Sequence, residues 1–302
     1  MLNGIIYVIF MIALGYFLIV CKVLPPDSRP HISSILMSLC FPAMILKSFS
    51  AVDPGALLST GFSTLVVTLV FSLLPAGILL LKKNKGQLHS LYSFICGIGN
   101  VSFVCIPLLR IFLTDAEMVA VYLHVSIQDL LIWALFHPAF AGSQKTKQWK
   151  ALLTEPCLLA VALGLILCFG NISLPGFLSM PIDALDACVS PLALVFLGMT
   201  IGQYGRSALK GGKIPIFYTL YKVVAYPAVI FLILSPFLEE KIAILMAILF
   251  GSPAPVASVV WMQRYTEDPT PAIACLIPST LLYYILYTPL LLFLCSRGIF
   301  GV

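Results

Sequence analysis

The sequence predicts an all-α polytopic membrane protein with about ten transmembrane helices, and three observations support this fold class. First, 61% of the 302 residues are hydrophobic and only 10% are charged, whereas a soluble domain is usually about 45–50% apolar and about 25% charged. Second, the mean hydropathy is +1.07. Third, apolar stretches of about 20 residues, the length needed to cross a bilayer, recur along the chain with only short loops between them. No extramembrane domain is therefore expected.

The expected spans follow one another with little polar sequence between them. The first is not typical of a signal peptide, because no basic residue precedes it and no small-residue cleavage site follows. Nine scattered cysteines without a CxxC pair predict neither a disulfide framework nor a zinc site. The predicted ranges are 4–21, 32–50, 57–81, 88–112, 117–140, 151–170, 184–203, 214–236, 241–263 and 272–295.

Basic residues are distributed unevenly between the two sets of loops, and this predicts orientation. Four lie in the even-numbered loops or at the ends of the even-numbered spans: Lys47, Arg110, Lys241 and Arg297. Because basic loops stay in the cytoplasm, both termini are expected on the extracytoplasmic side of the cytoplasmic membrane. The net charge of +5 then reports orientation, and no nucleic-acid partner is expected. Twelve lie in the odd-numbered loops: Lys22, Arg29, Lys82, Lys83, Lys85, Lys145, Lys147, Lys150, Arg206, Lys210, Lys213 and Arg264.

The two halves of the chain show a near-constant offset between matching residues, which predicts an internal repeat. Each half, 1–150 and 151–302, holds five expected spans, so the second copy must enter the membrane upside down. Such inverted repeats are common in transporters and place ligand sites near the bilayer midplane. The matching pairs are Pro42 and Pro191, 149 positions apart, Pro75 and Pro227, 152 apart, Gly99 and Gly251, 152 apart, and Pro138 and Pro289, 151 apart.

Two stretches, 96–109 and 251–255, combine apolar character with residues that interrupt a helix. Glycine weakens a helix interior and proline removes a backbone donor. Within hydrocarbon such breaks are tolerated only where they are buried or line a cavity. In the predicted repeat the fourth and ninth spans are symmetry mates, so the breaks are expected to cross near mid-membrane. The alternative is a pair of plain proline kinks in a packed bundle.

Asn100, within the first break, is the leading candidate for ligand contact. Its amide offers two donors and an acceptor, which suit a carboxylate. Helix N-termini beside a break add positive dipole ends that favour anions. The alternative is that Asn100 only satisfies the local backbone. The full set of expected substrate-binding residues is Asn100, Ser102, Pro107, Ser252, Pro253 and Pro255.

Asp129 and Lys222 are ionisable residues within expected spans, and such residues are functional candidates by default. Together they could form an internal ion pair, or Asp129 could couple transport to protons. Ser279 and Thr280 are alternative partners for Asp129. Lys222 could instead extend along the apolar surface to the cytoplasmic face.

The remaining polar and aromatic residues predict no further site. His124 and His137 show no metal-ligand spacing and are expected in the core or at the interface, so no metal and no cofactor is expected. No HExxH, GxSxG or Walker-type motif is present, and no enzyme is predicted. Four acidic residues near span ends are expected to be solvated: Asp183, Asp186, Glu239 and Glu240. Packing or interfacial anchoring is expected for the aromatic residues Trp133, Trp149, Trp261, Tyr283, Tyr284 and Tyr287.

The chain resembles the auxin efflux carrier family over essentially its whole length, in its bacterial form, which lacks a long central loop. The segment Gly99-Asn-Val-Ser-Phe-Val-Cys-Ile-Pro107 fits the family pattern GNxxFxxIP. Segments 190–199, 221–227 and 253–272 resemble further family motifs. The resemblance implies a crossover and binding role only for Asn100, Pro107 and Pro253. Pro255 departs from the family pattern.

The resemblance implies a scaffold of spans 1, 2, 6 and 7 and a transport unit of spans 3–5 and 8–10. It also implies a secondary transporter or facilitator of a small organic anion, a malate- or malonate-like carboxylate, working in efflux by an elevator type of alternating access. The alternatives are a sodium-coupled symporter of the bile acid carrier type and a non-transporting receptor or assembly subunit. Besides lipid and the anion, a homodimer partner is left open.

Overall fold

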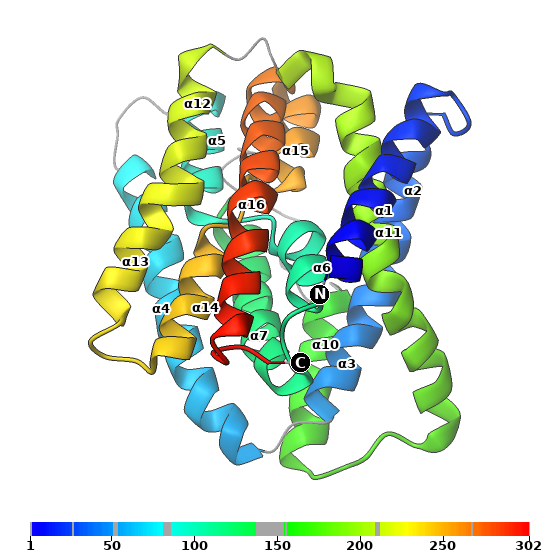
Figure 1. Ribbon diagram of the computed structural model, residues 1–302, viewed down its shortest axis with the longest axis vertical. Coiled ribbons are helices and arrows are strands. Elements are labelled where there is room, and N and C mark those ends of the chain that lie inside the picture. The colour runs from blue at the N-terminus through cyan, green and yellow to red at the C-terminus, as the bar shows by residue number, and fades with distance from the viewer. Residues whose placement is uncertain are drawn as a thin grey trace.

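The computed structural model shows a bundle of helices (Figure 1). It describes residues 2–25, 27–50, 54–80, 86–136, 154, 156–208, 212–266 and 268–301, and these residues contain no strand. The predicted all-α class is therefore confirmed. The predicted residues His137 and Trp149 lie outside the described residues, and the side chain of Trp133 does too.

Helix is present in each of the predicted ranges. In the first half the helices are α1 (Leu2–Val20), α2 (Ser28–Ile35), α3 (Phe41–Ser50), α4 (Pro54–Leu80), α5 (Gln87–Gly97), α6 (Ile106–Leu109) and α7 (Asp115–Leu131). In the second half they are α10 (Pro156–Phe169), α11 (Gly176–Ala208), α12 (Lys213–Leu220), α13 (Tyr226–Leu234), α14 (Glu240–Phe250), α15 (Val256–Thr266) and α16 (Thr270–Ser296).

Several of these helices are long and apolar enough to cross a membrane. Four qualify by length and composition: Ser28–Ser50, Gly176–Gly205, Lys213–Leu234 and Thr270–Ser296. A fifth candidate is a pair, Leu88–Gly97 and Val101–Leu109, bent by 48° at the first predicted break. Shorter apolar helices cover Ile6–Val20, Gly61–Pro75 and Pro156–Phe169. The chain is thus a multi-pass membrane protein, and the count of ten spans and the inverted repeat stay predictions.

Wider, π-helical turns occur just before prolines within these helices. They are η1 (Leu36–Cys40), η2 (Val101–Cys105) and η5 (Tyr221–Ala225), and each ends two residues before a proline. A further π turn, η3 (Ile132–Phe136), follows α7. Proline cannot donate to the carbonyl four residues earlier and its ring crowds that carbonyl, so the turn widens.

Tyrosine hydroxyls bond to the carbonyls four residues before two of the helix prolines, Pro227 and Pro75. Pro227 leaves the carbonyl of Val223 free, and the Tyr287 hydroxyl donates to it at 2.9 Å. The Tyr226 hydroxyl donates to Phe71, the carbonyl four residues before Pro75. Neighbouring helices thus complete each other's backbone hydrogen bonding, as buried backbone in a membrane protein requires.

Two glycines bring α1 and α11 into close contact. A Cβ at Gly15 would lie 2.0 Å from the carbonyl oxygen of Val195, and a Cβ at Gly198 would lie 2.0 Å from that of Ile12. Small residues at such positions let membrane helices pack backbone against backbone. Since each helix supplies one glycine, neither residue can be enlarged without separating the helices.

The helices pack in two groups that meet along α11. One group joins α1, α2, α3, α10 and α11, and the other joins α4, α5, α7 and α12 to α16. Contacts of α11 with α16, α6 and η2, and of α3 and α10 with α7, connect them. In Figure 1 the turn after α1 and the start of α12 lie at one end of the bundle, and the α10–α11 and α13–α14 turns lie at the other.

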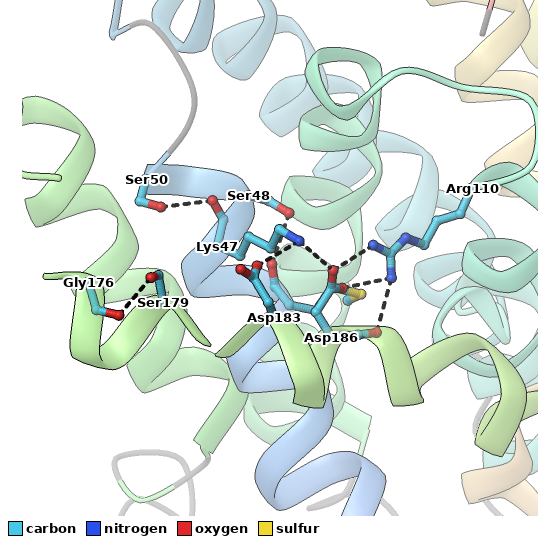
Figure 2. A network of polar contacts seen from close by, with 9 residues as sticks. Lys47, Ser48, Ser50, Arg110, Gly176, Ser179, Asp183 and Asp186 are labelled. Carbon is cyan, nitrogen blue, oxygen red and sulfur yellow. Dashed lines mark hydrogen bonds and ion pairs between the residues drawn. The ribbon is translucent and has the colours of Figure 1, made fainter. Parts of the chain in front are cut away.

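An ion network joins α3 and α11 to the end of α6 (Figure 2). Asp186 Oδ2 of α11 accepts hydrogen bonds from Arg110, just after α6, at 2.9 Å and from Lys47 of α3 at 3.1 Å. Lys47 also pairs with Asp183 at 2.8 Å. The expectation that Asp186 is solvated was wrong, since it is only 3% exposed. The helix begins at Gly176 rather than near 184, which places Asp186 within α11 against α3 and α6.

Candidate functional site

Both predicted breaks interrupt helix inside the protein. After α5 the backbone at Ile98 is extended (φ −109°, ψ 146°), and helix resumes at Val101. The second break runs from Gly251 to Pro255 between α14 and α15. Pro253 and Pro255 have no N–H to continue the helix. Residues 97–101 and 251–256 are all buried.

The two breaks contact each other directly. The backbone N–H of Asn100 donates to the carbonyl of Pro253 at 2.8 Å. Beside this bond, Gly99 lies so close to Ser252 that a Cβ on Gly99 would be 1.7 Å from the Ser252 Oγ. The two breaks therefore meet, and their close approach requires glycine at position 99. We call this contact the crossing, and its place near mid-membrane stays a prediction.

Each break is supported by a polar side chain from the next long helix along the chain. The N–H of Gly99 donates to Gln128 Oε1 of α7 at 3.3 Å, and the N–H of Ala254 donates to Ser279 Oγ of α16 at 3.3 Å. Gln128 and Ser279 are 151 positions apart, the offset on which the predicted repeat rests. The sequence reasoning had not singled out Gln128, and had offered Ser279 only as a partner of Asp129. The repeat offset could have indicated both.

Three buried polar atoms near the crossing have no hydrogen-bond partner among the described residues: Asn100 Nδ2, Ser252 Oγ and Gln128 Nε2. Ser252 Oγ lies beside the thiol of Cys105, which is a weak partner. A buried polar group without a partner costs about 1–3 kcal/mol. These atoms are therefore positions at which a polar ligand could bond.

The helices that leave the crossing point their N-terminal ends at it. One begins at Val101, directly after Asn100, and the other begins at Val256. Free N–H groups and the positive end of the helix dipole favour an anion there. The amide donors of Asn100 and Gln128 act in the same direction. The charge character of the crossing thus suits a carboxylate.

The predicted prolines have different roles in this geometry. Pro253 supplies the carbonyl that accepts from Asn100. The carbonyl of Pro255 accepts from the N–H of Ser258 at 3.0 Å and from its hydroxyl at 2.6 Å, which closes the first turn of α15. Pro107 is buried in the first turn of α6, away from the break.

Ser102 and Asp129 lie together, at the boundary between the two helix groups. They line a small cavity of about 10 Å³ with Phe41 and Met44 of α3 and Cys157 of α10. A half-open groove of about 560 Å³, lined almost entirely by apolar side chains, lies between α1 and α11 on one side and α16 on the other, and includes Thr280. Asp129 and Thr280 are 151 positions apart, so one lining residue of the cavity matches one of the groove in the predicted repeat.

Lys222 does not reach the surface. Its side chain is 0% exposed, and Nζ donates to the carbonyl of Cys96 at 3.3 Å rather than to a carboxylate. The alternative in which Lys222 extends to the cytoplasmic face was therefore wrong. Lys222 lies between the apolar helices α12 and α13, so its side chain stays within the bundle.

Of the other singled-out residues, His124 and Tyr283 are buried and Tyr284 is partly buried, and each makes a hydrogen bond. His124 is a core residue whose Nδ1 lies 2.9 Å from Thr68 Oγ1. Tyr283 and Tyr284 bond to the carbonyls of Ile248 at 3.5 Å and Val104 at 3.1 Å. The α16 tyrosines are thus internal packing residues rather than interfacial anchors, and they hold both broken helices. The described residues contain no group of three or more His, Cys, Asp or Glu side chains that could hold a metal ion.

Comparison with known proteins gives one family. Residues 1–150 match the model of the family described as membrane transport protein. The matched range coincides with the first predicted repeat. No curated protein matches the chain.

Proposed function

The chain belongs to the membrane transport protein family, the family of the auxin efflux carriers, and from this premise we propose that it is a secondary carrier of a small organic anion. The substrate is a mono- or dicarboxylate of the malate or malonate type, moved outward across the cytoplasmic membrane.

One observation carries this proposal: the crossing of the two breaks with the unpartnered amide of Asn100 beside it. The amide is 4% exposed and its Nδ2 has no partner among the described residues. Together with the helix N-termini at Val101 and Val256, it would offer hydrogen-bond donors and positive dipole ends to one carboxylate. The three hydrogen bonds described at the crossing, Asn100–Pro253, Gly99–Gln128 and Ala254–Ser279, involve no acidic side chain.

Movement would follow the boundary between the two helix groups. We propose that the group containing both breaks moves past the group built on α1 and α11, as in an elevator. The contacts between the groups support this: α11 packs against α16, α6 and η2, and Arg110, just after α6, pairs with Asp186 of α11.

The experiment is transport by the purified full chain in proteoliposomes. Vesicles loaded with unlabelled malate, malonate, acetate or indole-3-acetate should take up the same labelled anion by exchange. The Asn100→Ala protein should be inactive although it folds, and Asn171→Gly, an exposed substitution that keeps the left-handed backbone (φ 49°), should be fully active. Equal uptake by Asn100→Ala and the unaltered protein would refute the site. Binding of these anions without any flux would favour a receptor.

A further inference from the structure

The C-terminal end of α5 lies inside the protein, where its last carbonyls need partners. The final carbonyls of a helix have no partner within the helix. The carbonyl of Phe94 accepts from the N–H of Ile98 at 2.9 Å. The next two accept from side chains: Ile95 from the Tyr218 hydroxyl at 3.1 Å and Cys96 from Lys222 Nζ at 3.3 Å. Both donors come from one helical stretch, a turn apart.

The Lys222 ammonium is held without a carboxylate. No acidic oxygen of the described residues lies within 4.0 Å of it, because none of their ion pairs includes Lys222. Its neighbours are the Cys96 carbonyl, the Tyr226 ring, whose centroid is 5.5 Å from Nζ, and the negative end of the α5 dipole. A buried charge is retained only where its surroundings favour it, and these surroundings are those of a cation site.

Carbonyl oxygens at the C-terminal ends of broken helices are what transporters use to coordinate sodium. Here such an end is occupied by an amino group of the chain itself. The second break lacks this feature: at the end of α14 the Ile248 carbonyl accepts from the Tyr283 hydroxyl at 3.5 Å. The residue 152 positions before Lys222 is Val70, which is 48% exposed. Among the described residues, a lysine amino group therefore bonds to the helix end at the first break and a tyrosine hydroxyl to the helix end at the second.

We infer that Lys222 is a built-in cation that fills, at the end of α5, the place a coupling metal ion would take. Transport by this chain, resting on the function proposed above, is then independent of sodium. When protonated, the amino group also places a positive charge beside the crossing. Lys222 acts as a positioning residue. It holds the end of α5 through the Cys96 carbonyl, and it acts on the anion electrostatically, without direct contact.

Removal of the side chain provides a test that needs no substrate. Lys222→Ala leaves the Cys96 carbonyl unpaired and opens a space the length of three carbons and a nitrogen. The full chain in detergent should melt at a lower temperature with this substitution. Millimolar n-propylammonium chloride should restore the melting temperature of the variant and leave the unaltered protein unchanged. Tetramethylammonium chloride should restore nothing, because it has a charge but no N–H donor.

Two further variants separate charge from packing. Lys222→Met fills the space without a charge, so n-propylammonium should not raise its melting temperature. Lys213→Ala, an exposed lysine at the start of α12, should behave as the unaltered protein. Stabilisation of Lys222→Ala by both salts alike, or no loss of stability on substitution, would overturn the inference.

Sodium dependence tests the same inference without any variant. Uptake by the unaltered protein should be the same within twofold when sodium is replaced by choline on both sides of the vesicle membrane. A tenfold or larger loss would overturn the built-in cation. The two proposals fail separately: propylammonium rescue with no transported carboxylate would refute only the proposed function, and sodium-dependent carboxylate uptake would refute only the role of Lys222.

Discussion

The contact between the two breaks predicts a specific steric coupling between Gly99 and Ser252. A methyl group added by Gly99→Ala would lie 1.7 Å from Ser252 Oγ, 2.9 Å from its Cβ and 3.4 Å from its carbonyl oxygen. Rotation of the serine side chain can relieve the first contact. It cannot relieve the second, because Cβ is fixed to the backbone. The two breaks must therefore move apart.

The expected cost follows from this geometry. Gly99 does not have a positive φ, so alanine introduces no backbone strain there and the cost is steric. Overpacking of this kind typically costs about 1–3 kcal/mol. Ser252→Gly removes both Oγ and Cβ and leaves only the contact at 3.4 Å, which is tight but close to an ordinary van der Waals distance. In that background Gly99→Ala should be nearly neutral.

The assay is a double-mutant cycle on melting temperature and on unfolding free energy of the purified protein in one detergent. The coupling energy between positions 99 and 252 should be about 1–3 kcal/mol. Gly77→Ala is the matched control, since a Cβ there meets no atom within 4 Å and alanine should stabilise α4 by about 0.5–1 kcal/mol. If the effects at 99 and 252 add within about 0.5 kcal/mol, the breaks do not touch as described.

Three further substitutions test single contacts, each by its melting temperature against the unaltered protein. Gln128→Leu leaves the Gly99 N–H unpaired in the core and should cost about 1–3 kcal/mol. Tyr287→Phe removes the hydroxyl that donates to the Val223 carbonyl, four residues before Pro227, and should cost a similar amount of stability. Asp186→Asn removes the negative charge that Arg110 and Lys47 share. The expected loss of stability is about 1–3 kcal/mol, because both cations are partly exposed. An unchanged melting temperature would contradict the contact concerned.

Much of the helical layout follows from the sequence, because an apolar stretch of membrane length has few alternatives to helix. The same rule identifies the breaks: residues such as Gly99 and Pro253 within hydrocarbon-compatible sequence require special surroundings. The contact between the breaks followed from their equivalent positions in the two halves. These predictions depend on local composition and spacing, both of which are visible in one chain.

The partners of individual side chains could not be predicted in the same way. Whether Lys222 extends to the surface or bonds to Cys96 depends on which face of α12 and η5 meets α5. The burial of Asp186 depends on where α11 begins, and helix starts are poorly defined by apolar length alone. The bond from Tyr287 to Val223 joins residues 64 positions apart and depends on two helices that each contain a proline.

The most direct test of the account is binding of a dicarboxylate to the crossing. Titration of the full-length protein with malate and malonate, followed by calorimetry, should give a single site for at least one of them. Asn100→Ala should abolish that binding while its melting temperature without ligand stays close to that of the unaltered protein, and Asn171→Gly should bind normally. Binding of the same anion with the same affinity by Asn100→Ala would contradict the claim that the two breaks form the substrate site.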